Sequence, residues 1–239
     1  MEDLKRVLIV CSVHEEIGKA TAGELHWLLN RLRPEVLFLE CSPTDFPAFQ
    51  DGPCRTLESA AVRHYRRHHD VTLEPVDLHL PEVELLESKI GELFERIEAE
   101  SPRYCQLDSA NRQYTAEGGI AYLNSPDNAW LEREIQREMR TTVEAVRDSR
   151  LTELYALWIR THDLREQEMI RRVEAFASHA PFEKGVLLVG AGHRPSLFGR
   201  LQLPRSDGAV AWDFDWQHEV ASSGGDVGPN GDPIGRDMR

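Results

Sequence analysis

Two short, uninterrupted apolar runs, at residues 7–11 and 36–39, stand on either side of a segment with helical periodicity. Apolar runs of this length are typical of strands that are buried on both faces of a parallel sheet. The segment between the two runs predicts a helix, and Pro34, which follows this segment, is expected to end that helix. The apolar positions of that helix are Leu25, Leu28, Leu29 and Leu32. Because only a parallel crossover fits so short a connection, the pattern predicts an α/β fold.

The same alternation continues along the chain. We predict a third strand at 71–77, a late buried strand at 185–189 that leads into Gly-Ala-Gly-His, and an edge strand at 209–216. Helical spacing of apolar residues predicts helices at 57–68, 83–97, 130–146 and 151–177. We therefore expect a central, mainly parallel sheet with flanking helices, and a long helical segment between the third strand and the late strand.

Two stretches lack this periodicity. Residues 102–128 are polar and contain Gly118 and Gly119, so we expect a long loop or lid there. Residues 219–239 contain almost nothing to bury, and we expect a disordered tail. The remaining residues, 1–218, are predicted to form a single domain.

The composition limits the class of protein. The chain has 239 residues, with 28 basic and 41 acidic side chains, and a formal net charge of −13. This excess of acid repels phosphate backbones and anionic membrane surfaces, so we expect neither nucleic acid nor a membrane as a partner. No apolar run approaches the ~20 residues that span a bilayer, and the start has no signal-peptide profile, which predicts a cytoplasmic protein. The spacing of the four cysteines favours neither a disulfide scaffold nor a zinc ribbon.

Side chains suited to catalysis or metal binding follow the predicted strands. His14 follows the first strand, and Glu40 ends the second. Asp77 ends the third strand, and His193 follows the late strand. In a parallel α/β sheet, ligands bind beyond the carboxyl ends of the strands, so we expect these side chains to gather at one edge. A lone histidine after a strand is more often a loop or capping residue, but imidazoles and carboxylates together are metal ligands or acid–base groups.

A further candidate, Glu166, lies on the helix predicted at 151–177. The apolar stripe of that helix, extended backward by helical spacing, reaches Glu166 and His162. An ionised carboxylate on an apolar face needs a cation, which a metal or the neighbouring Arg165 would supply. The alternative is that Glu166 lies at the solvent edge of the stripe.

Other motifs carry weaker signals. His64 and His68 lie four residues apart, a spacing that can hold a metal, but the edge of an amphipathic helix is the favoured interpretation. Cys11 and Cys41 stand at the ends of two strands, where either a reactive thiol or a small buried side chain fits. Residues 190–192 lack the spacing of a dinucleotide-binding loop, and the chain has no P-loop motif.

Four short motifs follow one another along the chain. They are CSVH at 11–14, RPEVLFLE at 33–40, REQEM at 165–169 and VGAGH at 189–193. Together they resemble the GTxH turn, the RPD-type strand ending in Glu, the Arg-Asp/Glu-x-x-Met helix and the GAGH turn of the TraB/PrgY and Tiki group, within the erythromycin esterase and ChaN-like superfamily. Asp77 resembles the aspartate of that group's DR turn, although Leu78 replaces the arginine. The resemblance covers most of residues 7–200.

This resemblance implies an α/β domain with a metal-dependent hydrolase or peptidase-like centre. Carried over by position, His14, Glu40 and His193 would form the core of the site. Arg165 and Glu166 would support that core, and Asp77 would have a second role. The Gly-Thr of the family's first motif is Cys-Ser here, which alters the turn before His14.

We therefore expect a hydrolase that acts on a small-molecule or peptide substrate. In one version His14, Glu40 and His193 hold a divalent metal, for which Mn, Co, Zn and Fe are all suitable. Glu166 would then be the general base and Arg165 would stabilise an oxyanion. In a metal-free version a histidine activates water directly. Peptide, ester and lactone bonds stay open as substrates, as does a homo-oligomeric state. The alternative is a non-catalytic protein that binds or senses a small ligand or peptide.

Overall fold

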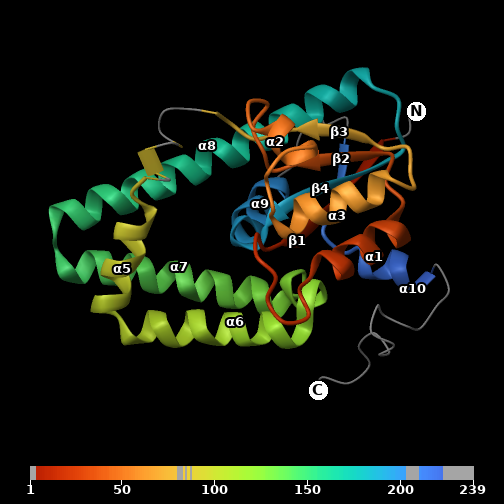
Figure 1. Ribbon diagram of the computed structural model, residues 1–239. Helices are drawn as coiled ribbons and strands as arrows, with labels where there is room; N and C mark the ends of the chain where they lie inside the picture. The colour runs from red at the N-terminus through yellow and green to blue at the C-terminus, as the bar shows by residue number, and fades with distance from the viewer. Residues whose placement is uncertain (1–3, 80–82, 84, 87, 203–209, 223–239) are drawn as a thin grey trace.

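The computed structural model describes residues 4–79, 83, 85–86, 88–202 and 210–222 (Figure 1). Its centre is a sheet of five parallel strands in the order β3-β2-β4-β1-β5. These strands are β1 (Lys5–Ser12), β2 (Val36–Leu39), β3 (Thr72–Pro75), β4 (Lys184–Gly190) and β5 (Val210–Asp213). The predicted α/β fold with a parallel sheet is confirmed, and the strand predicted at 209–216 is the edge strand β5.

Helices surround the sheet and extend beyond it. Near the sheet lie α1 (Ala22–Leu32), α2 (Phe46–Gln50), α3 (Leu57–Arg66), α9 (Arg194–Leu201) and α10 (Gln217–Ser222). Between β3 and β4 come α5 (Ile90–Glu100), α6 (Pro102–Leu123), α7 (Pro126–Val146) and α8 (Ser149–His179). In Figure 1, α1 and α3 lie on one face of the sheet, and α5, α6, α7 and the first half of α8 form an arm to its side. The predicted long helical segment is therefore present.

Polar side chains fix where several of these helices begin. Thr21, Ser101 and Ser125 each accept a hydrogen bond from the backbone N–H three residues later, at the starts of α1, α6 and α7. Arg33 ends α1 in the left-handed conformation, with φ of 47°, and Pro34 prevents its continuation. The helix predicted at 83–97 is interrupted by a turn at Ser88 and Lys89, after which α5 begins.

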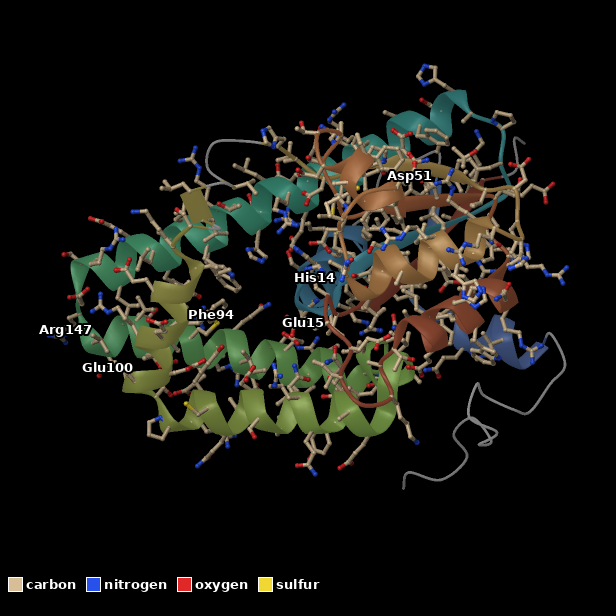
Figure 2. The ribbon with its side chains drawn as sticks, viewed as in Figure 1. His14, Glu15, Asp51, Phe94, Glu100 and Arg147 are labelled. Carbon is tan, nitrogen blue, oxygen red and sulfur yellow. The ribbon has the colours of Figure 1, made fainter. Side chains whose placement is uncertain are left out.

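Two hydrophobic cores support this arrangement. The first lies around the sheet and includes Val10, Leu37, Leu187 and Val173. The second joins α5, α6, α7 and the first half of α8. Figure 2 labels Glu100 and Arg147 at the end of the arm that is farthest from the sheet, and His14 at the side of the sheet that faces the arm. The candidate site thus lies where the two parts meet.

The prediction of a long loop at 102–128 is wrong, because residues 102–123 form α6. Tyr104 and Leu107 pack into the core of the arm, whereas Ile120 and Leu123 pack into the core of the sheet. Between these two pairs, Gly119 has a left-handed conformation with φ of 63° and kinks the helix. Because the apolar side of the helix changes at this kink, no single helical period is visible in the sequence.

Of the tail predicted at 219–239, residues up to Ser222 lie in α10, and residues 223–239 lie outside the described part. None of the described helices combines the length and apolar character that are needed to cross a membrane.

The kink in α6 leads to a prediction about pH and stability. The Glu24 carboxylate on α1 accepts a hydrogen bond of 2.8 Å from the Ile120 N–H, just after the kink. Burial raises the pKa of Glu24 from 4.5 to about 7. The folded state therefore loses stability relative to the unfolded state as the pH rises from 4.5 to about 7. Glu24→Gln stays neutral, and we expect it to raise the free energy of unfolding at pH 8 by roughly 1 kcal/mol, a value discounted for partial exposure.

Urea denaturation of the two proteins between pH 4 and pH 8 measures this effect. The increase in unfolding free energy should be absent at pH 4, because the Glu24 carboxyl is then neutral in both the folded and the unfolded state. Glu15→Gln, in the exposed loop that also holds His14, is the control and should change little at either pH. A gain of equal size at both pH values would contradict the argument.

Candidate functional site

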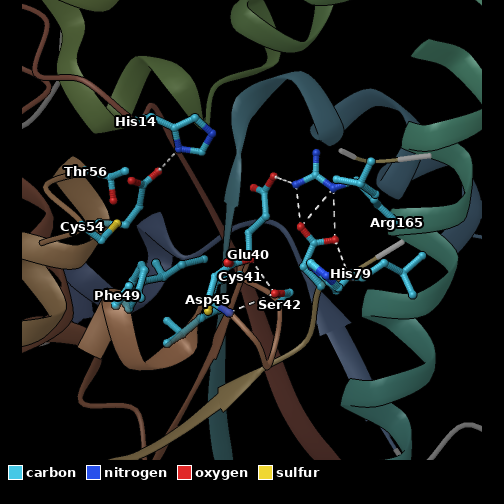
Figure 3. Close-up of a pocket in the computed structure, with 17 residues that line it drawn as sticks. His14, Glu40, Cys41, Ser42, Asp45, Phe49, Cys54, Thr56, His79 and Arg165 are labelled. Atoms are coloured by element: carbon cyan, nitrogen blue, oxygen red, sulfur yellow. Dashed lines mark hydrogen bonds and ion pairs between the residues drawn. The ribbon is translucent and has the colours of Figure 1, made fainter. Parts of the chain in front are cut away.

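The carboxyl ends of four strands meet beside a pocket. The pairing of Ser12 with Gly190, and of Leu39 with Leu188 and Pro75, aligns the ends of β1, β2, β3 and β4 at one edge. The residues that follow these strands therefore lie close together, as parallel topology requires. A pocket of about 460 Å³ opens there (Figure 3). His14, Glu40, Asp77 and Arg165 are among the residues that line it.

Arg165 on α8 is held by two carboxylates. Its Nη2 donates to Glu40 Oε1 and to Asp77 Oδ2, both at 2.6 Å, and its Nε lies 3.0–3.1 Å from the two oxygens of Asp77. Burial opposes the charge of Arg165, but Glu40 and Asp77 more than offset this and raise its pKa. Its remaining nitrogen, Nη1, has no hydrogen bond to any described residue. The guanidinium is thus fixed in place with one end available to a ligand.

His193, in the short 3-10 helix Ala191–His193, lies between two carboxylates. Its Nδ1 is 2.9 Å from Glu166 Oε1, and its Nε2 is 3.3 Å from Glu40 Oε1. Burial lowers the pKa of His193, but the two carboxylates overcome that effect and raise it to about 9. The ring also stacks on His162, with 4.8 Å between centroids. His193 is therefore a buried imidazolium that links β2, β4 and α8.

Glu40 is the common partner of these two cations. Its Oε1 accepts from Arg165 and forms an ion pair with His193 Nε2, and its Oε2 accepts from the Gly190 N–H at 2.5 Å. Burial raises the pKa of this carboxyl, but the cations, His193 first, outweigh burial and hold the pKa well below its ordinary value. Glu40 is thus a permanently ionised group with both oxygens engaged, which makes it a poor base.

Glu166 is buried on α8 and is also fully engaged. Besides His193, it accepts hydrogen bonds from Ser196 and from Arg200 Nε. The cation that the sequence argument required is therefore supplied by His193 and Arg200, whereas Arg165 turns to Glu40 and Asp77. Neither Glu166 nor His193 is among the described residues that line the pocket.

His14 makes a separate pair on another wall of the pocket. Its Nδ1 lies 3.2 Å from Glu58 Oε1, and that oxygen also accepts from Ser12 Oγ at 2.7 Å. The hydrogen bond to Glu58 raises the pKa of His14 to about 9, against the opposing effect of burial. The side chain of His14 is 62% exposed and that of Glu58 only 8%. An accessible imidazole is thus oriented by a buried carboxylate (Figure 3).

Glu58 and Ser12 are site residues that the sequence analysis missed. Glu58 lies in the first turn of α3, where an acidic residue normally interacts with the helix dipole and gives no signal of its own. One weak signal existed, because Ala61 and Val62 lie three and four residues after Glu58, which places Glu58 on the buried side of the helix. The other oxygen of Glu58, Oε2, is buried without a hydrogen-bond partner among the described residues.

The cysteines at the strand ends behave as small buried side chains. Burial raises the pKa values of Cys11 and Cys41 to about 12, so neither forms a thiolate at neutral pH.

The three predicted metal ligands do not converge on one point. His14 bonds to Glu58, whereas Glu40 and His193 bond to each other and Arg165 stands beside them. In the part of the chain that the structure describes, no group of three His, Cys, Asp or Glu side chains could hold a metal ion. A cation at Glu40 would have to displace the Arg165 guanidinium, so the residues as arranged do not fit a metal.

Comparison of the chain with protein-family models, with curated proteins and with solved structures finds no match.

Proposed function

We propose that this protein is a hydrolase whose reaction centre is the pocket between His14 and Arg165. One observation carries the proposal: an accessible imidazole, oriented through Nδ1 by the buried Glu58 carboxylate, shares a pocket with a guanidinium that is fixed by two carboxylates. An oriented base and a preorganised cation are the two groups that acyl hydrolysis requires. The resemblance to the TraB/PrgY and Tiki group agrees with a hydrolase.

His14 would act as the general base. In the neutral ring, Nδ1–H donates to Glu58, and Nε2 carries the lone pair that accepts a proton from water. The water oxygen then attacks the carbonyl carbon of the substrate, and the carbonyl oxygen takes up the negative charge. When the tetrahedral intermediate collapses, His14 returns the proton to the leaving alcohol or amine, and the acid is released. Glu58 is a positioning residue, because it acts only through His14.

Arg165 would stabilise the negative oxygen through its free Nη1. Its other nitrogens are held by Glu40 and Asp77, so the guanidinium needs no rearrangement as charge develops. His193 holds Glu40 from the opposite side and is a positioning residue for this clamp. In this arrangement Glu166 supports His193 and is not the base.

The charges in the pocket favour an uncharged acyl substrate. The positive charge of His14 is balanced by the negative charge of Glu58. The two positive charges of Arg165 and His193 are balanced by the two negative charges of Asp77 and Glu40. Asp45, which also lines the pocket, adds a negative charge at its rim. Phe49 and Leu78 provide apolar contact surface. Esters, lactones and uncharged peptides therefore fit better than anionic substrates.

The screen that tests the proposal uses p-nitrophenyl esters, lactones and short peptide amides with wild type, His14→Gln and Glu15→Gln. We expect hydrolysis of at least one class that is lost in His14→Gln and kept in Glu15→Gln. If no class is hydrolysed above the rate seen with His14→Gln, the proposal fails.

A second function is favoured by the ion pairs themselves. Glu40 and Glu166 are both paired with cations. A rigid, polar pocket of this kind therefore also suits a protein that binds or senses a small ligand without catalysis. Thermal stabilisation of both wild type and His14→Gln by an ester or peptide that neither protein hydrolyses would favour this function.

The metal content of the protein is a separate prediction. Purified, tag-free protein is expected to hold less than about one-tenth of an equivalent of Mn, Co, Zn or Fe, because Arg165 already neutralises Glu40. A chelator should leave any hydrolysis unchanged. Elemental mass spectrometry of wild type, His14→Ala and His193→Ala measures this. Near-stoichiometric metal in wild type that is lost in both variants would restore the predicted metal site.

A further inference from the structure

Four histidines gather where α1 and α3 meet, outside the site described above. The rings of His26 on α1 and His64 on α3 stack with 3.9 Å between centroids and 8° between planes. His68 lies one turn farther along the chain, 5.9 Å from His64. His69 Nε2 lies 2.7 Å from Asn30 Oδ1 on α1. These four residues, the histidine cluster, thus form part of the contact between the two helices.

The cluster differs from His14 and His193 of the site, because each of those two has a carboxylate partner. Among the described residues, no carboxylate forms an ion pair with His26, His64, His68 or His69. Burial lowers the pKa of His26, and the other three histidines lower it further. Because the rings of His26 and His64 lie only 3.9 Å apart, positive charge on both rings at once would be repulsive.

The charged groups around the cluster do not relieve this repulsion. Arg63 and Arg66 on α3, and Arg67 directly after it, are cations, and Arg63 donates to backbone oxygens of Phe49 and Cys54. Asp70 follows His69 on an exposed turn without an ion pair to the described part of the chain.

Carboxylates on the other elements near α1 are engaged elsewhere. On the segment before α10, Asp215 pairs with His218 at 3.0 Å. Glu24 of α1 itself turns to the Ile120 N–H of α6. Neither carboxylate is positioned to neutralise a proton on His26.

The two helices that the cluster joins also carry the proposed base. His14 lies in the loop that leads to α1, and Glu58 lies in the first turn of α3. The Leu57 N–H donates to the His14 carbonyl at 2.9 Å, beside the 3.2 Å contact of His14 Nδ1 with Glu58. These two contacts hold His14 at the start of α3, so a shift of α1 relative to α3 would act on the His14–Glu58 pair through the loop of residues 15–21 that joins His14 to α1.

We propose that the histidine cluster is an acid-sensitive contact: protonation of its rings loosens α1 from α3, and the His14–Glu58 pair is lost with that contact. The loosening itself stands on the cluster alone, and its effect on activity rests on the function proposed above. This acid-sensitive contact would confine full activity to neutral and alkaline pH.

Hydrogen exchange of the full chain tests the loosening without any substrate. We expect protection of the α1 and α3 amides, corrected for the intrinsic effect of pH, to fall about five- to tenfold from pH 7.5 to pH 5.5, the factor expected for rings charged about 4 Å apart in water. His26→Phe keeps a ring in the stack but cannot be charged, and it should lose less than half as much protection. His64→Phe is the second variant, and His179→Gln, on an exposed part of α8, is the control that should behave like wild type.

Two results would overturn the proposal. One is equal protection of α1 and α3 at both pH values in wild type. The other is the same acid-induced loss in His26→Phe and His64→Phe as in wild type, which would place the sensitive group elsewhere.

The effect on activity is measured separately, from the slope of log kcat/KM against pH. Loss of one proton from His14 alone gives a slope of one. If the histidine cluster also acts, the slope of wild type should be steeper than one below about pH 6, whereas the slope of His26→Phe should not. A steeper slope without loss of protection contradicts the loosening. Loss of protection in a protein without hydrolytic activity would support the loosening and refute only the proposed function.

Discussion

Replacing His14 by glutamine is expected to lower kcat/KM for ester hydrolysis by about 10³-fold, within the usual range for loss of a general base. The change removes the ring but leaves Glu58, Arg165 and the pocket wall in place. Glu15→Gln, at the next residue of the same exposed loop, should retain full activity. A loss below about tenfold would show that His14 is not the base.

The pH profile separates a base from a merely structural role. Because the pKa of His14 is raised to about 9, the neutral, basic form of the ring increases as the pH rises, and kcat/KM should increase up to about pH 9. In Glu58→Gln the main cause of the raised pKa of His14 is removed, so the ascending part of the profile should move to lower pH, toward the ordinary imidazole pKa of 6.5. A profile that falls between pH 7 and pH 9 would instead make His14 an acid.

The largest effect on stability is expected from Arg165→Met. This change leaves the buried Glu40 and Asp77 without their shared cation, and breaking a buried ion pair in this way costs about 3–5 kcal/mol of unfolding free energy. Arg171→Met is the matched control on the same helix. The side chain of Arg171 is 64% exposed and pairs with Glu168 at the surface, so its loss should change the unfolding free energy little.

The pH dependence of this loss follows from the signs of the pKa shifts. Glu40 has a lowered pKa in the folded state, so its ion pair stabilises the protein above the unfolded pKa and the stabilisation is lost as the pH falls. The difference between wild type and Arg165→Met should therefore narrow toward pH 3, because the carboxylates of the unfolded chain are protonated there while Glu40 of the folded wild type stays ionised. His193 has the opposite sign, and its contribution is lost as the pH rises through about 9. Urea denaturation between pH 3 and pH 9 measures both trends, and a loss independent of pH would contradict the ion-pair argument.

The fold was largely predictable from the sequence because buried parallel strands have a simple pattern. The apolar runs at 7–11, 36–39 and 185–189 are uninterrupted, and each became a central strand. Parallel topology then required His14, Glu40, Asp77 and His193 to lie at one edge. The helix α6 escaped prediction because its apolar residues face two different cores on either side of Gly119.

The pairing of the site residues was not predictable in the same way. Arg165 and Glu40 are 125 residues apart, and no local rule states which carboxylate an arginine will choose. We expected Arg165 and Glu166 to act together. Adjacent residues on a helix point in different directions, however, so the two side chains reach different partners. Glu58 was missed because its position in the first turn of α3 is explained equally well by the helix dipole.

The helix α8 has 31 residues and is therefore about 46 Å long. Leu151, Leu154 and Trp158 in its first half belong to the core of the arm, whereas Met169 and Val173 in its second half belong to the core of the sheet. Removing either part would leave an apolar stripe of α8 exposed to water. We therefore expect the two cores to unfold in one cooperative transition, and Arg165 lies between the two groups of core residues along α8.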